Sequence, residues 1–185
     1  NRALISGCNG NIDTIIMLAD AEDVHATAHI GSAKITVSGV TVAVNVVNAV
    51  NSYQGSAVIE NSNLTGSVLN VQSFENRHYY ESDTYNTVTS ADVGSAGGSG
   101  ITISAVSGTV NKAKAENTSE IKAYIVGSVL NGYAVAIIAD GRSEVSSKID
   151  AASNIGLLNV AVISTEANAN GTVIAGFEPT STQSN

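Results

Sequence analysis

The stretch Ala57-Val-Ile-Glu-Asn-Ser-Asn-Leu64 decides the fold, because the chain repeats it. It returns as Ala123-Tyr-Ile-Val-Gly-Ser-Val-Leu130, with looser copies at residues 28–35 and 147–155. Each copy places a small residue two positions before an Ile, and an Ile or Leu follows after a Ser. Internal repetition of this kind indicates a fold that is built by stacking one structural unit.

The offsets between copies predict the size of that unit. The Ile copies at positions 59 and 125 lie 66 residues apart, whereas the apolar runs that begin at Val40 and Ile101 lie 61 apart. This difference predicts an insertion of about five residues in the later copy. Residues 18–20 resemble residues 138–140 at an offset of 120. Since these offsets are near multiples of twenty, we expect rungs of about 20 residues.

The repeated segments have the composition of β-strands. Short runs rich in Val and Ile, such as residues 40–47 and 101–106, are bounded by Gly, Asn, Asp and Ser. Residues 15–23 could pass for a helix, but their likeness to residues 136–140 favours a strand. Asn-Gly pairs at 9–10, 131–132 and 170–171 predict tight turns with positive φ. The expected fold class is all-β, a parallel β-helix (β-solenoid) of stacked strands.

Bulk properties exclude several classes of function. The chain has 185 residues and a net charge of −8, with 43% hydrophobic but only 4% aromatic residues. It has no basic stripe, so we expect neither nucleic-acid binding nor attraction to anionic lipid. No stretch reaches the length of a membrane-spanning helix, so membrane insertion is not expected. The single Cys8 allows no disulfide within the chain and is expected to be a small buried hydrophobe.

The domain organisation follows from the repeats. Residues 1–185 are expected to form a single β-solenoid segment. The chain starts at Asn1 in what reads as the middle of a rung, without a signal peptide. We therefore expect it to be a piece of a longer repetitive protein.

Several of these segments resemble a known family. Residues 116–128, with Ala123-Tyr-Ile-Val-Gly-Ser128 at their end, and residues 95–103 are similar to the repeats of the fusobacterial leukotoxin family of filamentous adhesins. That family is similar to the filamentous haemagglutinins of two-partner secretion. The resemblance implies a right-handed parallel β-helix, a place outside a bacterial cell, and a role in adhesion or host-cell contact. It carries no catalytic motif, so it implies no catalytic residue.

One segment differs from the rest of the chain in composition. Residues 74–85 hold four of the eight aromatic residues together with several charges. Tyrosines beside polar groups are typical of binding surfaces, because each offers flat apolar area and a hydroxyl. The candidate ligand-contact patch consists of Arg77, Tyr79, Tyr80, Asp83 and Tyr85. The alternative is an ordinary surface loop or a strand face with stacked tyrosines.

Metal, cofactor and catalytic sites are not expected. His25 and His29 could share a zinc ion on a helix, but on a strand they would lie about 13 Å apart. Residues 97–100 supply glycines of a calcium-binding repeat, but Thr102 stands where Asp is needed. No Gly-x-Ser-x-Gly motif is present, and carboxylates such as Asp92 and Asp140 are isolated. We therefore expect no enzyme activity.

The sequence is best interpreted as a non-catalytic stalk or adhesive segment of a secreted or cell-surface bacterial adhesin or toxin. Its expected partners are a host-cell surface or a glycan. The first alternative is a structural subunit that polymerises end to end into an extracellular filament, because exposed strand edges template strand addition. The second alternative is a carbohydrate-active β-helix enzyme, which would need several carboxylates in one groove.

Overall fold

The computed structural model describes residues 1–21, 24–30, 36–75, 87–93, 101–141, 143–149 and 153–179. Within these residues the chain forms β-strands and no helix. In chain order the strands are β1 (Arg2–Ser6), β2 (Asn9–Asn11), β3 (Thr14–Ala21), β4 (His25–Ile30), β5 (Thr36–Asn51), β6 (Gln54–Glu60), β7 (Asn63–Thr65), β8 (Val68–Glu75), β9 (Thr87–Val93), β10 (Ile101–Asn117), β11 (Glu120–Asn131), β12 (Ala134–Gly141), β13 (Ser143–Ile149), β14 (Ser153–Ile155), β15 (Leu158–Ala169) and β16 (Thr172–Pro179). The prediction of an all-β chain is confirmed.

The strands form four sheets, and every pairing among the described residues is parallel. One sheet contains β1, β6, β11 and β16 with the short strands β2 and β7, and another contains β5, β10 and β15 with β14. The two remaining sheets are β3-β8-β12 and β4-β9-β13. After forming a strand in each sheet, the chain returns to the first sheet and pairs a new strand with the earlier one. We call each such stretch of chain a pass.

The pairing offset differs from the predicted one. Paired strands lie 54 residues apart in the first step (β1 with β6), 66 in the second (β6 with β11) and 52 in the third (β10 with β15). The expected rung of about 20 residues is wrong as a hydrogen-bonding unit. Each pass contains several strands of similar composition, and their mutual likeness produces the shorter apparent period.

The repeat alignment is correct in part. Ile59 pairs with Ile125, as the repeated motif predicted. Val40, however, pairs with Val106 rather than with Ile101, at the same offset of 66 residues. The predicted insertion of about five residues is therefore wrong, because the Val-rich strand β5 and the Ala-x-Ile motif in β6 both pair with residues 66 positions later.

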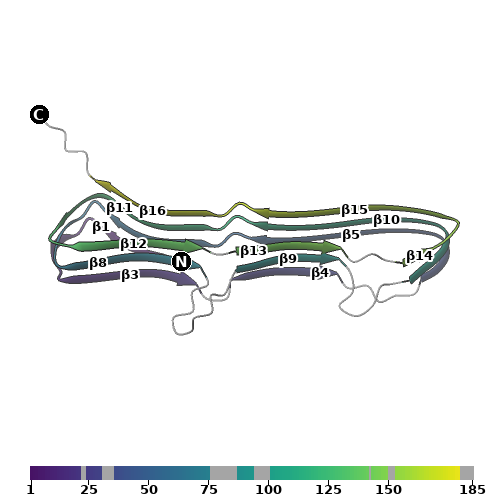
Figure 1. Cartoon of the computed structure of the whole chain (residues 1–185), viewed down its shortest axis with the longest axis horizontal. Helices are drawn as coiled ribbons and strands as arrows, with labels where there is room; N and C mark the ends of the chain where they lie inside the picture. The colour runs from purple at the N-terminus through teal and green to yellow at the C-terminus, as the bar shows by residue number, and fades with distance from the viewer. Residues whose placement is uncertain are drawn as a thin grey trace, which may run out of the picture.

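The sheets are arranged in two long layers (Figure 1). β3-β8-β12 and β4-β9-β13 follow one another along one layer, and the chain runs back along the other through β15 and β16 (Figure 1). Two apolar cores lie between the layers. One joins β3 and β8 to β6 and β11 through residues such as Leu69 and Ile59, and the other joins β9 to β5 and β10 through Ala91, Val47 and Ala113.

Alternation of side chains explains why residues 14–21 form a strand. Ile15, Met17 and Ala19 are buried, whereas Ile16 and Leu18 on the opposite face are 67% and 41% exposed. This period of two places every second residue in the core. The prediction of a strand at residues 15–23 is confirmed over the described part, up to Ala21.

A recurring corner follows the Ala-x-Ile motif at residues 6–8, 60–62 and 126–128. The middle residue has a positive φ each time: Gly7 at 64°, Asn61 at 49° and Gly127 at 58°. Gly and Asn are the residues that adopt this conformation most readily. At the third position, the Ser62 amide donates to the Ser128 hydroxyl oxygen at 3.1 Å, so successive corners are linked to each other.

Two local predictions need correction. Of the three Asn-Gly pairs, only 131–132 forms a turn with positive φ, at Gly132 (79°), while Asn9 and Gly10 lie inside β2. Cys8 is exposed rather than buried. It occupies the corner position of Ser62, and its thiol donates to the Ser6 carbonyl oxygen at 3.5 Å. A thiol replaces a hydroxyl at a turn here, so burial was the wrong expectation for this residue.

Candidate functional site

The predicted contact patch lies outside the described residues. Arg77, Tyr79, Tyr80, Asp83 and Tyr85 all fall between β8 and β9, in residues 76–86. The patch therefore remains a prediction from composition. The described residues offer two other places with the features of a site: an inner cavity beside Glu75 and an outer surface around Tyr124.

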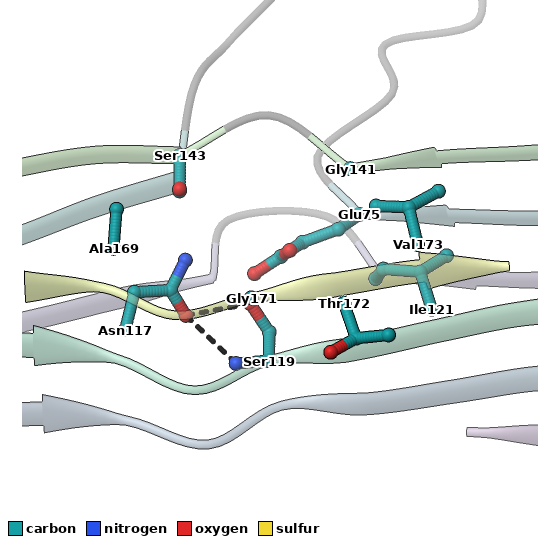
Figure 2. A pocket seen from close by; sticks show the side chains of 10 residues that line it. All are labelled: Glu75, Asn117, Ser119, Ile121, Gly141, Ser143, Ala169, Gly171, Thr172 and Val173. Carbon is teal, nitrogen blue, oxygen red and sulfur yellow. Dashed lines mark hydrogen bonds between the residues drawn. The ribbon is translucent and has the colours of Figure 1, made fainter.

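The inner cavity has a volume of about 110 Å³ and lies where β8 and β12 end and where β11 and β16 begin (Figure 2). Its polar lining comes from the Glu75 carboxylate, the Asn117 amide and three hydroxyls. The hydroxyls belong to Ser119, Ser143 and Thr172. A polar cavity of this size can hold ordered water.

Glu75 is the most unusual of these residues, since its side chain is 4% exposed. It is the last residue of β8 and occupies a position where the neighbouring strands carry Ala21 and Gly141. The Asn51 side-chain amide donates to Glu75 Oε1 at 3.1 Å. A Cβ at Gly141 would lie 3.0 Å from Ile121 Cγ1, 3.2 Å from Val173 Cγ2 and 3.6 Å from Glu75 Oε2, so these side chains pack closely around the glycine.

Asn117 closes the turn beside the cavity. Its Oδ1 accepts hydrogen bonds from the Ser119 backbone amide at 2.9 Å and from the Ser119 hydroxyl at 2.6 Å. Figure 2 shows the Asn117 amide nitrogen on the other side, toward the cavity. Asn51, one pass earlier, accepts in the same way from the Tyr53 amide at 3.2 Å. Such Asn turns stabilise chain corners without regular backbone pairing.

Tyr53 lies one pass before Ser119, near the same junction. Burial raises the pKa of the Tyr53 phenol, and the negative charges of Asp20 and Glu75 raise it further. Its hydroxyl lies over Gly55, where an added Cβ would approach within 2.7 Å. Tyr53 thus fills this position in its pass, whereas the smaller residues Ser119 and Gly171 take its place in the next two passes and line the cavity.

This cavity offers limited chemistry. The residues that line it include one carboxylate and no histidine, lysine or arginine. Glycoside hydrolysis requires a pair of carboxylates at a defined separation, which these lining residues do not supply. Over the described ranges, no group of three or more His, Cys, Asp or Glu side chains is placed to hold a metal ion. The geometry favours a polar packing junction.

Neutralising Glu75 should therefore stabilise the protein. We expect Glu75→Gln to raise the free energy of unfolding by about 1 kcal/mol, because the amide keeps the shape and the Oε1 acceptor but removes a buried charge. Denaturant unfolding at neutral pH measures the change. The control is Glu116→Gln, which removes an ion pair with Lys114 (2.9 Å) at the surface and should leave stability unchanged within error. A loss of stability in Glu75→Gln would contradict this account.

The outer surface around Tyr124 has a different character. Two hollows of about 180 and 200 Å³ share Lys122 and Tyr124 in their linings. Tyr124 is half-buried and pairs in register with Val58 on one side and with Gly176 on the other. A side chain at Gly176 would meet nothing within 4 Å, so one hollow exists because a side chain is missing there.

Charged groups of both signs surround Tyr124. Lys122 forms an ion pair with Glu120 at 2.5 Å. Arg2 lines one hollow and Glu178 the other. A tyrosine ring between charged hydrogen-bonding groups is suited to bind a polar ligand that also has an apolar face, such as a sugar ring.

Sequence reasoning missed Tyr124 as a candidate, although a signal for it was present. The motif Ala123-Tyr-Ile125 places Tyr124 between two residues that are 0% exposed. Since side chains alternate across a strand, Tyr124 has to face outward. His25 and His29, by contrast, lie on strand β4 as predicted, four residues apart.

Comparisons with protein-family models, with curated proteins and with solved structures found no match to this chain. The part of the chain that the structure describes contains no helix long and apolar enough to cross a membrane.

Proposed function

We propose that the chain is a non-catalytic stalk segment of a secreted or cell-surface bacterial adhesin or toxin. In this proposal the four sheets are the faces of one continuous right-handed parallel β-solenoid, which extends along the stacking direction and holds other parts of the molecule away from the cell. The extracellular location rests on the resemblance of residues 95–103 and 116–128 to filamentous adhesin repeats.

One observation carries this proposal, the in-register stacking of like residues from successive passes. The column through the Ala-x-Ile motif contains Ala3, Ala57, Ala123 and Ala175, and the column two residues further contains Ile5, Ile59, Ile125 and Phe177. In these two core columns each pass repeats small and large apolar side chains at the same positions, which supports growth in one dimension. Such growth suits a rod better than a closed globular enzyme.

A second candidate function, end-to-end association into a filament, is favoured by the sheet edges. β5 and β15 are the outer strands of their sheet, and β3 and β12 are the outer strands of another. Edge strands present backbone N–H and C=O groups that can pair with another chain. Negative-stain electron microscopy over a concentration series separates the two: filaments that lengthen with concentration favour the subunit, and short rods of constant length favour the stalk.

The adhesive role in this proposal is assigned to the surface around Tyr124. The test is binding of the purified, labelled chain to a glycan array and to cultured host cells, with light scattering on the same samples to establish oligomeric state. Saturable binding by the monomer supports an adhesive segment. If the folded chain binds neither glycans nor cells, the segment is a spacer and the adhesive part of the proposal is wrong.

Tyr124→Ala is expected to weaken glycan binding at least about fivefold, because loss of an aromatic platform removes on the order of 1–3 kcal/mol of contact energy. Tyr124→Phe, which keeps the ring, should retain most of the binding. Gly176→Val fills the adjoining hollow from an open strand position and should also weaken binding while the protein stays folded.

The triple variant Tyr79→Ala, Tyr80→Ala and Tyr85→Ala tests the patch predicted from composition in the same assay. If this triple variant abolishes binding and Tyr124→Ala does not, the contact lies in residues 76–86 and the assignment to Tyr124 is wrong.

A further inference from the structure

The outer face of the sheet β5-β10-β15 is unusually apolar. Its outward side chains in residues 40–44, 106–110 and 158–162 form three columns in register: Val40–Val106–Leu158, Val42–Gly108–Val160 and Val44–Val110–Val162. We call this nine-residue surface the valine plate. Val42 is 77% exposed and Val160 is 57% exposed. No charged residue interrupts the plate.

The pattern of these strands is the reverse of what a water-facing sheet requires. The residues between the outward valines point inward, and they are small or polar: Ser107 is 1% exposed, and its hydroxyl donates to the Asn159 side chain. Slightly further along, the Asn45 and Asn111 side chains hydrogen-bond at 2.9 Å. A sheet with one face in water normally turns its polar side outward. The sequence therefore marks the outer face as one that becomes covered.

The area of the plate is sufficient for a specific interface. Seven of its nine residues are 41–77% exposed. A contiguous patch of this kind is on the order of the ~300–600 Å² of the largest apolar patch on a typical monomer, and a standard interface takes ~800 Å² from each partner. The outer face of the opposite layer differs in this respect. There, the exposed residues Ile16 and Ile138 are separated by the polar side chains of Asn70 and Gln72.

The charges beside the plate indicate which partner fits. The nearest charge is Lys112, an exposed residue that follows Val110 on the same face. Further along the strands, Lys114 pairs with Glu116 at 2.9 Å and with Glu166 at 3.6 Å. A strongly charged partner would find one lysine at the rim of the plate and no charged residue within it. A flat apolar sheet of short β-branched side chains is complementary to another surface of the same kind, since such sheets pack face to face about 10 Å apart.

We propose that the valine plate binds the valine plate of a second copy of this chain, face to face about a twofold axis. The interface is isologous, so each copy contributes the same residues. It joins two rods side by side, a contact distinct from end-to-end stacking, and it does not depend on whether the surface around Tyr124 binds a glycan. Because each copy carries a net charge of −8, added salt screens their repulsion and strengthens the pairing.

Sedimentation equilibrium of the whole chain tests the proposal. The expected result is a monomer–dimer equilibrium whose dissociation constant falls as salt is raised. The double variant Val42→Lys and Val160→Lys places charges on either side of Gly108 and should weaken dimerisation at least about 100-fold, because lysines must then be buried against lysines. The control is Ile16→Lys with Ile138→Lys, exposed residues of the opposite layer, which should leave the dimer unchanged.

Two further variants keep the test decisive. If the lysine variant fails to fold, a second variant replaces four valines with threonine: Val42→Thr, Val44→Thr, Val160→Thr and Val162→Thr. Threonine keeps the β-branched shape, and this variant should still weaken the dimer. Gly108→Cys in a Cys8→Ser background places one thiol at the centre of the plate, in open space. A short bis-maleimide should then link two copies, which end-to-end stacking would not allow. A monomer at all concentrations, a dimer indifferent to the lysines, or oligomers that do not cross-link at position 108 would each overturn the proposal.

Discussion

Replacing Ile59 with alanine is expected to lower the free energy of unfolding by about 2–5 kcal/mol, because the side chain is fully buried. Ile59 is 0% exposed and lies in the middle of its column, between Ile5 and Ile125. Strands on both sides hold the backbone in place, so the space left by the side chain cannot close. Denaturant unfolding followed by circular dichroism measures the loss.

The matched control for this change is Ile16→Ala. Ile16 has the same side chain in the same fold but is 67% exposed on the outer face of β3. Its truncation should change stability by less than about 1 kcal/mol. Equal losses in the two variants would mean that the two layers do not enclose the core described above.

Gly66→Ala is expected to destabilise the fold by about 3 kcal/mol or more, because the added methyl group meets backbone rather than a movable side chain. A Cβ at Gly66 would lie 2.0 Å from the Ile12 carbonyl oxygen and 2.6 Å from the ring of Tyr133. The Tyr133 hydroxyl donates to the same Ile12 oxygen at 2.5 Å, so both neighbours are fixed. The two passes would have to separate locally to admit the methyl group.

Gly10→Ala provides the comparison for this variant. Gly10 lies in β2, has no positive φ, and would present its Cβ to open space. Its replacement should be neutral or slightly stabilising, because alanine restricts the unfolded chain more than glycine does. Thermal unfolding of both variants decides the matter; similar melting temperatures would contradict the close approach of successive passes at Gly66.

The sequence predicted the strands and one pairing, but not the size of the repeating unit. The pairing of Ile59 with Ile125 was visible because both lie in well-matched motifs. The offset of Val40 was misjudged because Val-rich segments match each other in several registers, and only burial selects one. The first step of 54 residues and the last of 52 leave no common period for the sequence to reveal.

The sites were less predictable than the strands. Tyr124 could have been inferred from alternation, since its neighbours Ala123 and Ile125 are both core residues. The cavity beside Glu75 could not, because it depends on Gly141 lying next to Glu75 in a neighbouring strand, 66 positions along the chain. The valine plate could not be predicted for a related reason. A Val-rich strand is expected to lie in the core, and only the structure shows which of its faces is covered.

The distance along the chain between paired strands has a consequence for folding. Each strand of the first pass finds its first partner more than fifty residues later, so no pairing forms until much of a second pass is present. Closing such long loops makes this first step slow. Every later strand then adds to an edge that already exists. A chain made from its amino end would therefore remain unfolded at the start and fold progressively, strand by strand, once much of the second pass had been made.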